Sequence, residues 1–175
     1  MDNKDREWLL REMIDGHLPK SSVDDIIRRG FLTAPASTKY HGDYEGGLFD
    51  HSFKVAQSLL TLTGGMKLRW KNTRSPRLIG LFHDLCKIDQ YEIDPETGKY
   101  RYRGDTLLKG HGDKSVQLLS QYTSLTEEEI LCIRYHMGAF TDSVEWSDYT
   151  RAVHAYPNVL WTHTADMMAA HIERV

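Results

Sequence analysis

The sequence predicts an all-α protein, a bundle of helices that carries one small β-hairpin. Three observations lead to this fold class. Apolar residues recur at helical spacing in several segments that Gly or Pro separates, only one short segment alternates as a strand would, and no internal repeat interrupts the pattern. With 175 residues, 40% of them hydrophobic and 27% charged, the chain can bury a core without disulfides. We therefore expect one domain over residues 1–175.

Two amphipathic helices are expected at the N-terminal end. Apolar residues between Trp8 and Ile14 recur at helical spacing, and Gly16 follows them as a stop signal. Ser22 is the expected N-cap of a second, short helix that ends at Gly30. Residues 31–47 are rich in Gly and have little periodicity, so they are expected to form a loop.

Two longer helices and the hairpin occupy the middle of the chain. An apolar stripe predicts a helix over about 48–62, which the glycines at 64–65 would end. A Ser-Pro pair at 75–76 starts the next helix, whose apolar run extends to Leu85. Alternating Tyr and Ile flank a turn containing Pro95 and Gly98, which predicts the hairpin over residues 91–102.

The C-terminal third is expected to be mainly helical. Helices are predicted at about 111–122 and 126–137, and the second of these begins with a capping box formed by Thr126 and Glu129. Residues 142–156 are polar and aromatic, which indicates a loop with a short helix. A terminal helix is expected to begin at Pro157.

Composition excludes several classes of protein. The net charge of −3 gives no broad electrostatic footprint for nucleic acid, although it leaves room for a small local basic cluster. The two cysteines, Cys86 and Cys132, have no metal-site spacing and do not resemble a secreted disulfide scaffold. The charged N-terminus is no signal peptide, and no apolar run is long enough to span a membrane. We therefore expect a cytoplasmic protein without a membrane partner.

The first candidate for a functional site is the segment Leu81-Phe82-His83-Asp84-Leu85-Cys86-Lys87. It places an adjacent His and Asp inside an apolar run. Burial of an ionised carboxylate costs several kcal/mol unless another group compensates its charge. A bound metal ion would provide that compensation.

Further ligand candidates lie on other expected helices, at intervals of 25 to 32 residues. The full set is His51, His83, Asp84, His111, His136 and Asp166. A helical bundle can direct one residue from each of several helices at a common centre. Imidazole and carboxylate ligands suit Fe, Mn, Co, Ni or Zn better than Ca. Six protein ligands exceed the number that one catalytic ion needs, and they suit two divalent ions bridged by one carboxylate.

The ordered set resembles the HD-domain superfamily of metal-dependent phosphohydrolases, specifically its dinuclear branch. The resemblance covers roughly residues 34–172. It includes Gly46-Gly47-Leu48-Phe49-Asp50-His51-Ser52, the His-Asp segment with the Lys that follows it, and the closing Thr164-Ala165-Asp166. It implies that His51, His83, Asp84 and Asp166 hold one ion. Asp84 would bridge to a second ion, held by His111 and His136.

The sequence departs from two branches of the family, and each departure makes one class of substrate less expected. A Gly-Tyr-Pro signature is absent, and Met137 stands where a second adjacent His would follow His136, so a cyclic dinucleotide is not expected. The sequence also lacks the oligonucleotide-binding domain that precedes the HD domain in some exoribonuclease relatives, which disfavours processive RNA degradation.

The expected function is hydrolysis of a phosphomonoester or phosphodiester by a metal-bridging hydroxide. The partner would be a small phosphorylated substrate, a nucleotide or short oligonucleotide. Asp84 and Lys87 are the expected catalytic residues, and Lys87 and His41 the expected substrate contacts. The basic, aromatic hairpin can cover the site.

Two other functions remain open at this point. A few HD-fold oxygenases with a mixed-valent di-iron centre use a closely similar ligand set with a Lys. A non-catalytic ligand sensor on the same scaffold is the third alternative.

Overall fold

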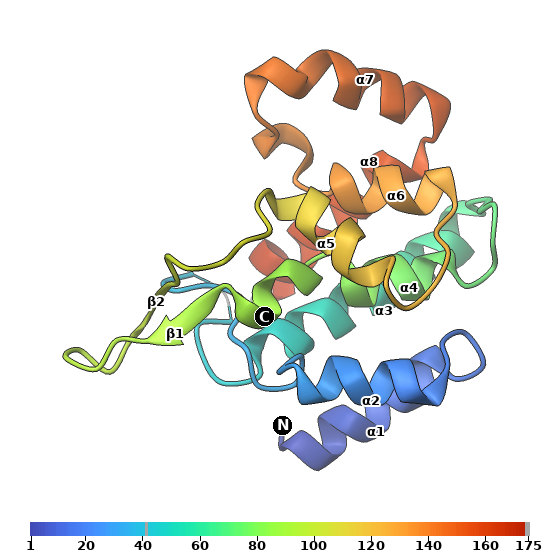
Figure 1. Ribbon diagram of the computed structural model, residues 1–175. Helices are drawn as coiled ribbons and strands as arrows, with labels where there is room; N and C mark the ends of the chain where they lie inside the picture. Colours follow the sequence, from blue (N-terminus) through green and yellow to red (C-terminus); the bar gives the residue numbers. More distant parts are fainter. Residues whose placement is uncertain (41, 174–175) are drawn as a thin grey trace.

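The computed structural model describes residues 1–40 and 42–173. It confirms the predicted fold class, because the described residues form a helical bundle with one two-stranded antiparallel sheet (Figure 1). The α-helices are α1 (Asn3–Ile14), α2 (Lys20–Arg28), α3 (Gly47–Met66), α4 (Ser75–Phe82), α5 (His111–Leu119), α6 (Glu127–Arg134), α7 (Trp146–Ala155) and α8 (Asn158–Met167). The strands are β1 (Tyr91–Ile93) and β2 (Tyr100–Tyr102). Short 3₁₀ segments are η1 (Leu85–Asp89), η2 (Gly138–Phe140) and η3 (Ser143–Glu145), and the π-helical turn η4 (Met168–Glu173) follows α8.

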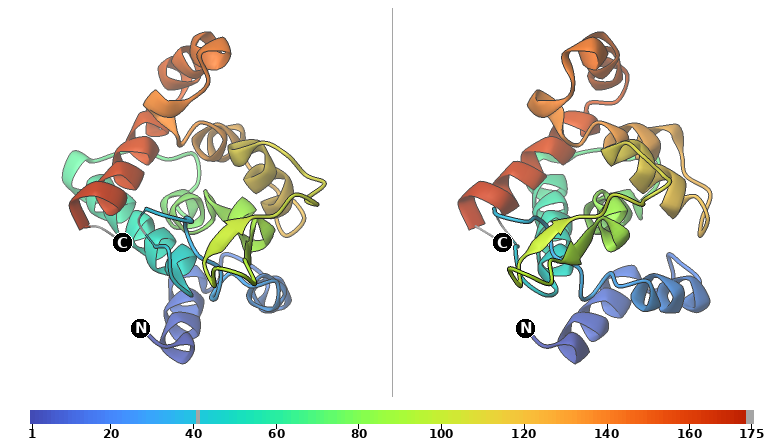
Figure 2. Two further views of the ribbon diagram at one scale, coloured as in Figure 1. Left: turned by 90° about the vertical axis from the view of Figure 1, so that its left-hand side faces the viewer. Right: turned by 60° about the vertical axis from the view of Figure 1, so that its left-hand side comes forward.

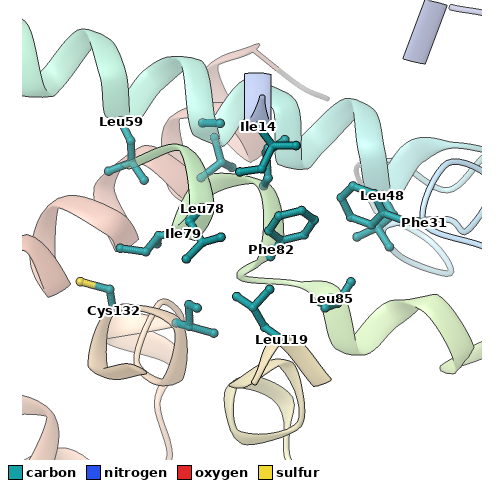
Figure 3. Packing of buried hydrophobic residues seen from close by; sticks show 14 of the residues in the cluster. Ile14, Phe31, Leu48, Leu59, Leu78, Ile79, Phe82, Leu85, Leu119 and Cys132 are labelled. Carbon is teal, nitrogen blue, oxygen red and sulfur yellow. The ribbon is translucent and has the colours of Figure 1, made fainter. Parts of the chain in front are cut away.

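The long helix α3 forms the middle of the bundle and packs against α4 and α8. Figure 3 shows side chains from several helices meeting in the apolar core beneath it. Phe31, from the segment after α2, lies against Phe49 of α3 and Phe82 of α4, with ring centroids 6.0 and 5.4 Å away. Such aromatic pairs add stabilisation beyond the apolar area they bury. The core thereby fixes the ends of α3 and α4 that carry the predicted ligands.

Two glycines allow the helices to approach closely. A Cβ at Gly80 of α4 would lie 2.3 Å from the Cα of Ala56 on α3. A Cβ at Gly112 of α5 would lie 2.2 Å from the carbonyl oxygen of Arg134 at the end of α6. Because real Cβ atoms do not come this close to backbone, both crossings require glycine. Both positions lie close in sequence to predicted ligands.

The N-terminal helices α1 and α2 cover one end of the bundle, opposite α7 (Figure 2). Arg6 of α1 forms a bidentate ion pair with Asp50 in the first turn of α3, with both hydrogen bonds 2.9 Å long. The Arg6 guanidinium also fills the space where Gly46 would carry a side chain. This pair therefore anchors α1 beside His51.

The expected hairpin forms, and its strands pair with Tyr91 opposite Tyr102 and Ile93 opposite Tyr100. Arg103 extends the contact by donating its backbone N–H to the carbonyl oxygen of Gln90, 3.0 Å away. The hairpin follows η1 directly and packs against it, so it lies beside the His-Asp segment.

Several element boundaries differ from expectation. The helix α4 ends at Phe82, so His83 and Asp84 lie in the turn before η1 and not inside a helix. The helix α3 continues through the glycines at 64–65 to Met66. Pro19, not Ser22, occupies the N-cap of α2. Residues 146–155 form a full helix, α7.

None of the described helices has the length and apolar character needed to cross a membrane.

Candidate metal centre

The structure brings the six predicted ligands together from separate elements. His51 lies on α3, His111 begins α5, and Asp166 lies near the end of α8. The other three lie just beyond helix ends: His83 and Asp84 after α4, and His136 after α6. Neighbouring imidazole rings of the cluster have centroids 4.8 to 5.4 Å apart. The cluster is buried, since His51 and His83 are 0% exposed and Asp84 is 3% exposed.

The Asp84 carboxylate lies between two groups of imidazoles. Its Oδ1 atom is 2.8 Å from His111 Nε2 and 3.4 Å from His136 Nε2. Its Oδ2 atom faces the other way, 3.6 Å from His83 Nε2 and 4.0 Å from His51 Nε2. Each oxygen therefore faces its own pair of potential ligands, which is the arrangement that a bridging carboxylate requires.

Asp166 completes the group on the Oδ2 side. Its Oδ1 atom is 3.0 Å from His51 Nε2 and 3.9 Å from His83 Nε2. Burial alone would raise the pKa of Asp166, but a hydrogen bond from His51 and electrostatic interactions with the neighbouring histidines lower it. The carboxylate is therefore ionised at neutral pH, as a metal ligand must be.

Helix ends orient two of the imidazoles. His83 Nδ1 lies 2.9 Å from the carbonyl oxygen of Gly80, and His136 Nδ1 lies 2.7 Å from that of Ile133. These carbonyl groups belong to the last turns of α4 and α6, where carbonyl oxygens have no N–H partner within the helix. A carbonyl oxygen can only accept, so each Nδ1 carries a hydrogen and Nε2 is the nitrogen that can bind a metal. Both Nε2 atoms point toward Asp84.

The pKa shifts of the clustered side chains favour binding of a cation. Burial lowers the pKa of His83 to about 3 and also lowers the pKa of His111, so both rings are neutral. Burial opposes the charge of Asp84, but Lys87, His83 and His111 hold its pKa well below the usual value. Burial likewise opposes a charged His136, yet hydrogen bonding to Asp84 raises its pKa.

His83 Nε2 provides the test of whether a metal fits. This atom is fully buried and has no hydrogen-bond partner among the described residues. An unsatisfied buried polar atom costs about 1–3 kcal/mol, and a cation would remove that cost. Its lone pair faces two carboxylates whose charge also needs compensation. The clustered His and Asp side chains can therefore hold a metal ion.

Lys87 shares the centre with Asp84. Its Nζ atom lies 2.6 Å from Asp84 Oδ2, and its side chain is 10% exposed. Burial disfavours the charged amine, but the neighbouring Asp84 carboxylate raises the pKa of Lys87. The ammonium group is therefore retained at neutral pH beside the predicted ligands.

Cys86 is a neighbour of the centre that the sequence did not reveal. Its sulfur lies 3.2 Å from His111 Nδ1, on the far side of the ring from Asp84. Burial raises the pKa of the Cys86 thiol to about 12, so the sulfur is a thiol at neutral pH. It orients the His111 ring through a weak contact. Only the proximity of Cys86 to Asp84 in the sequence could have indicated this role.

The family of the chain follows from a comparison with family models. The model described as HD domain matches residues 48–160, more than half of the chain. The chain belongs to the HD domain family. Members of this family are usually metal-dependent phosphohydrolases. Neither the curated proteins nor the solved structures with which the chain was compared gave a significant match. The matched range includes the predicted ligands from His51 to His136, whereas Asp166 comes from α8 beyond its end.

The HD domain has a cavity of about 750 Å³ that opens beside the cluster of predicted ligands. Asp84, Lys87, His111, His136 and Asp166 contribute to its wall. The aromatic side chains of Tyr40, Tyr91, Tyr102 and Phe140 also line it. Arg134 lies there together with the acidic residues Asp113, Asp142 and Glu145. The cavity has the size of a small-molecule site.

The hairpin of this HD domain contributes tyrosines, not arginines, to the cavity. Tyr91 and Tyr102 line it and pack against each other, with ring centroids 5.1 Å apart. Arg101 instead pairs with Glu92 at 2.8 Å, and Arg103 pairs with Asp105 at 2.8 Å, both at the surface. His41, predicted to contact substrate, lies outside the described residues.

Proposed function

We propose that this HD domain is a phosphohydrolase that cleaves a phosphomonoester or phosphodiester with two bound divalent ions. The observation that carries the proposal is the position of Asp84, whose two oxygens face separate pairs of imidazoles on the floor of an open cavity. His51, His83, Asp84 and Asp166 would hold one ion. Asp84, His111 and His136 would hold the other. This division follows the side of Asp84 on which each residue lies.

The bound cations would lower the pKa of water and neutralise charge on the phosphoryl oxygens. The protein contributes geometry and further charge. The carbonyl oxygens of Gly80 and Ile133 hold the His83 and His136 rings in one tautomer. Such hydrogen bonds fix a ligand's orientation and raise its basicity.

Lys87 is the residue proposed to bind the phosphoryl group. Its ammonium is retained at neutral pH, is nearly buried, and lines the cavity beside Asp84. A charge in such a water-poor environment stabilises a developing negative charge more strongly than it would in water. We therefore assign Lys87 to a non-bridging phosphoryl oxygen of the substrate.

The cavity lining supports a nucleotide or a short oligonucleotide as substrate. Tyr91 and Tyr102 provide aromatic surface near Lys87, and Phe140 is 65% exposed at the cavity. Aromatic faces stack on nucleobases irrespective of the base. Arg134 lies on the same wall, where its guanidinium pairs with Asp113 and Glu145 at 3.3 and 3.2 Å, so Lys87 is the cation assigned to the phosphate. A small ligand with both a phosphate and an aromatic base would satisfy these groups together.

The test is a hydrolysis panel with the purified chain. Bis(p-nitrophenyl) phosphate, p-nitrophenyl phosphate, nucleoside monophosphates and dinucleotides are assayed with Mn, Fe, Co, Ni or Zn added after chelation. We expect cleavage of at least one substrate, and we expect Asp84→Ala to abolish it. Asp148→Ala, which removes an exposed carboxylate from α7, is the control and should leave turnover unchanged.

Equal inertness of wild type and Asp84→Ala across the panel would contradict the proposal. Oxygen consumption during turnover of an iron-loaded sample, without phosphate release, would also contradict it and would favour an oxygenase. Parallel measurement of phosphate release and dissolved oxygen separates the two reactions.

A further inference from the structure

A second cavity lies outside the metal centre, between the loop that joins α3 to α4 and the junction of α7 and α8. Its volume is about 680 Å³. It contains none of the predicted metal ligands. Its wall is formed by Lys67, Leu68, Arg69, Trp70, Lys71, Glu128, Ala155, Tyr156, Pro157, Asn158 and Trp161. We call it the loop cavity.

Cations concentrate at the loop cavity. Lys67, Arg69 and Lys71 are exposed, and none of them forms an ion pair with a described residue. The segment from Lys67 to Arg77 contains five basic residues and no acidic one, in a chain whose net charge is −3. It is the local basic cluster that the overall charge conceals.

The carboxylate of the loop cavity is already satisfied. Glu128 is 4% exposed, and its two oxygens accept hydrogen bonds from the Lys71 backbone N–H at 2.7 Å and from the Asn158 amide at 2.8 Å. The Asn158 amide also donates to the Arg69 carbonyl oxygen at 2.8 Å. These bonds hold the loop against α6 and α8, and both oxygens of the Glu128 carboxylate are engaged within the protein. The loop backbone is therefore held in place, and its Lys and Arg side chains extend into solvent.

Aromatic rings lie among the cations. Trp70, Tyr156 and Trp161 line the cavity and are half-buried. The Trp70 indole is held by a 2.9 Å hydrogen bond to Thr63, and the Tyr156 hydroxyl donates to Glu127 at 2.7 Å. The Lys71 ammonium lies over the Tyr156 ring, 5.6 Å from its centroid, so a ligand would stack on Trp70 and Trp161.

We propose that the loop cavity binds a phosphorylated nucleoside unit, with its base on the aromatic rings and its phosphate on Lys67 and Arg69. Stacking on aromatic side chains together with phosphate contacts from basic residues is the chemistry of single-strand binding. The cavity has room for one such unit, which can be a free nucleotide or one residue of a strand. The site is separate from the proposed catalytic cavity and does not depend on its activity.

The test measures binding of a labelled strand of eight thymidines to the metal-loaded chain by fluorescence polarisation. Phosphorothioate linkages protect the strand from hydrolysis. Unlabelled thymidine monophosphate is the competitor. Competition at comparable affinity identifies a free-nucleotide site, whereas binding of the strand alone identifies a strand site. Both results support the proposal.

The charge variant is Lys67→Glu combined with Arg69→Glu. We expect at least tenfold weaker binding and a shallower dependence on salt, because two phosphate contacts are lost. The control is Lys4→Glu combined with Lys20→Glu, which changes the net charge equally on the remote helices α1 and α2. It should bind like the wild type. Equal weakening in both double variants would overturn the assignment, since it would reflect net charge alone.

The ring variants are Trp161→Leu and Trp161→Phe. Loss of one stacking contact is expected to weaken binding by roughly 5- to 100-fold in the Leu variant, and the Phe variant should retain most of the affinity. Lys87→Met, in the other cavity, should spare the part of the binding that the loop variants remove. Binding that Lys87→Met removes and the loop variants spare would overturn the proposal. Equally tight binding of an octamer of glutamate would also overturn it, because such binding needs no aromatic base.

Discussion

Lys87 lies one 3₁₀ turn after Asp84, and its ammonium nitrogen is 2.6 Å from the carboxylate oxygen Oδ2. The pair is nearly buried, so the charge of each group depends on the other. The end of α4 at Phe82 creates this geometry, because it places both residues in a tight turn.

Replacement of Lys87 by Met should separate catalysis from metal binding. The variant keeps the six proposed ligands but loses the cation assigned to the phosphoryl oxygen. We expect turnover to fall by roughly 100-fold while metal content stays unchanged. Steady-state kinetics and elemental analysis on the same sample provide the measurement. Loss of metal in this variant would show that Lys87 supports the centre and not the substrate.

Removal of the Arg6 side chain should destabilise the fold from outside the matched HD range. Arg6→Ala leaves the Asp50 carboxylate without its bidentate partner in a nearly buried position, which costs about 3 kcal/mol. Urea unfolding monitored by circular dichroism measures the change. The control is Arg151→Ala, whose ion pair on α7 is exposed and should contribute less than about 1 kcal/mol. Equal effects of the two substitutions would contradict the anchoring role of Arg6.

Two glycines should respond in opposite directions to replacement by Ala. Gly80→Ala places a methyl group against the Ala56 backbone, so it should weaken the α3–α4 crossing by about 1–3 kcal/mol or more. Gly64→Ala meets no atom within 4 Å inside the helix α3, and it should stabilise the protein by up to about 1 kcal/mol. Thermal unfolding of both variants tests the contrast. A stabilising Gly80→Ala would mean that the helices are less closely packed than described.

Stability should decline in alkali because of the buried thiols. Burial raises the pKa of Cys86 to about 12 and raises that of Cys132 as well. Above the unfolded value of about 8.5, the unfolded chain loses protons that the folded chain retains, so the free energy of unfolding falls as pH rises toward 12. Two such groups contribute a slope of at most about 2.7 kcal/mol per pH unit.

The check is urea unfolding between pH 8 and 10.5, with the Cys86→Ala and Cys132→Ala double variant as the comparison. The variant should lose the thiol contribution to the slope. The tyrosines with raised pKa values, such as Tyr91, remain in both proteins and contribute equally. Parallel pH profiles of the two proteins would contradict the burial argument.

Residue patterns predicted much of the fold and of the candidate centre. Helical periodicity located the bundle, and Thr126 with Glu129 forms the expected capping box. The six ligand candidates converge because they lie on or beside five helices of one bundle. The sequence misplaced the end of α4, since its apolar run continues through Leu85 and hides the turn at Asp84.

Other features depend on contacts between distant residues, which local patterns do not encode. The ion pair of Arg6 with Asp50 joins residues 44 positions apart. The contact of Cys86 with His111 depends on how α5 packs against η1. The glycines at 64–65 predict a helix end, but α3 continues past them to Met66 and ends at Lys67, whose backbone N–H bonds to the carbonyl oxygen of Thr63.

The central claim is that Asp84 bridges two ions, and the most direct measurement is the number of metal ions bound per chain. Elemental analysis after gel filtration should give two ions for the wild type. His111→Ala removes a ligand from one side only and should leave one ion. Asp84→Ala should leave fewer than one, because it removes a ligand from both. A wild type that binds a single ion, or an Asp84→Ala variant that still binds two, would contradict the account.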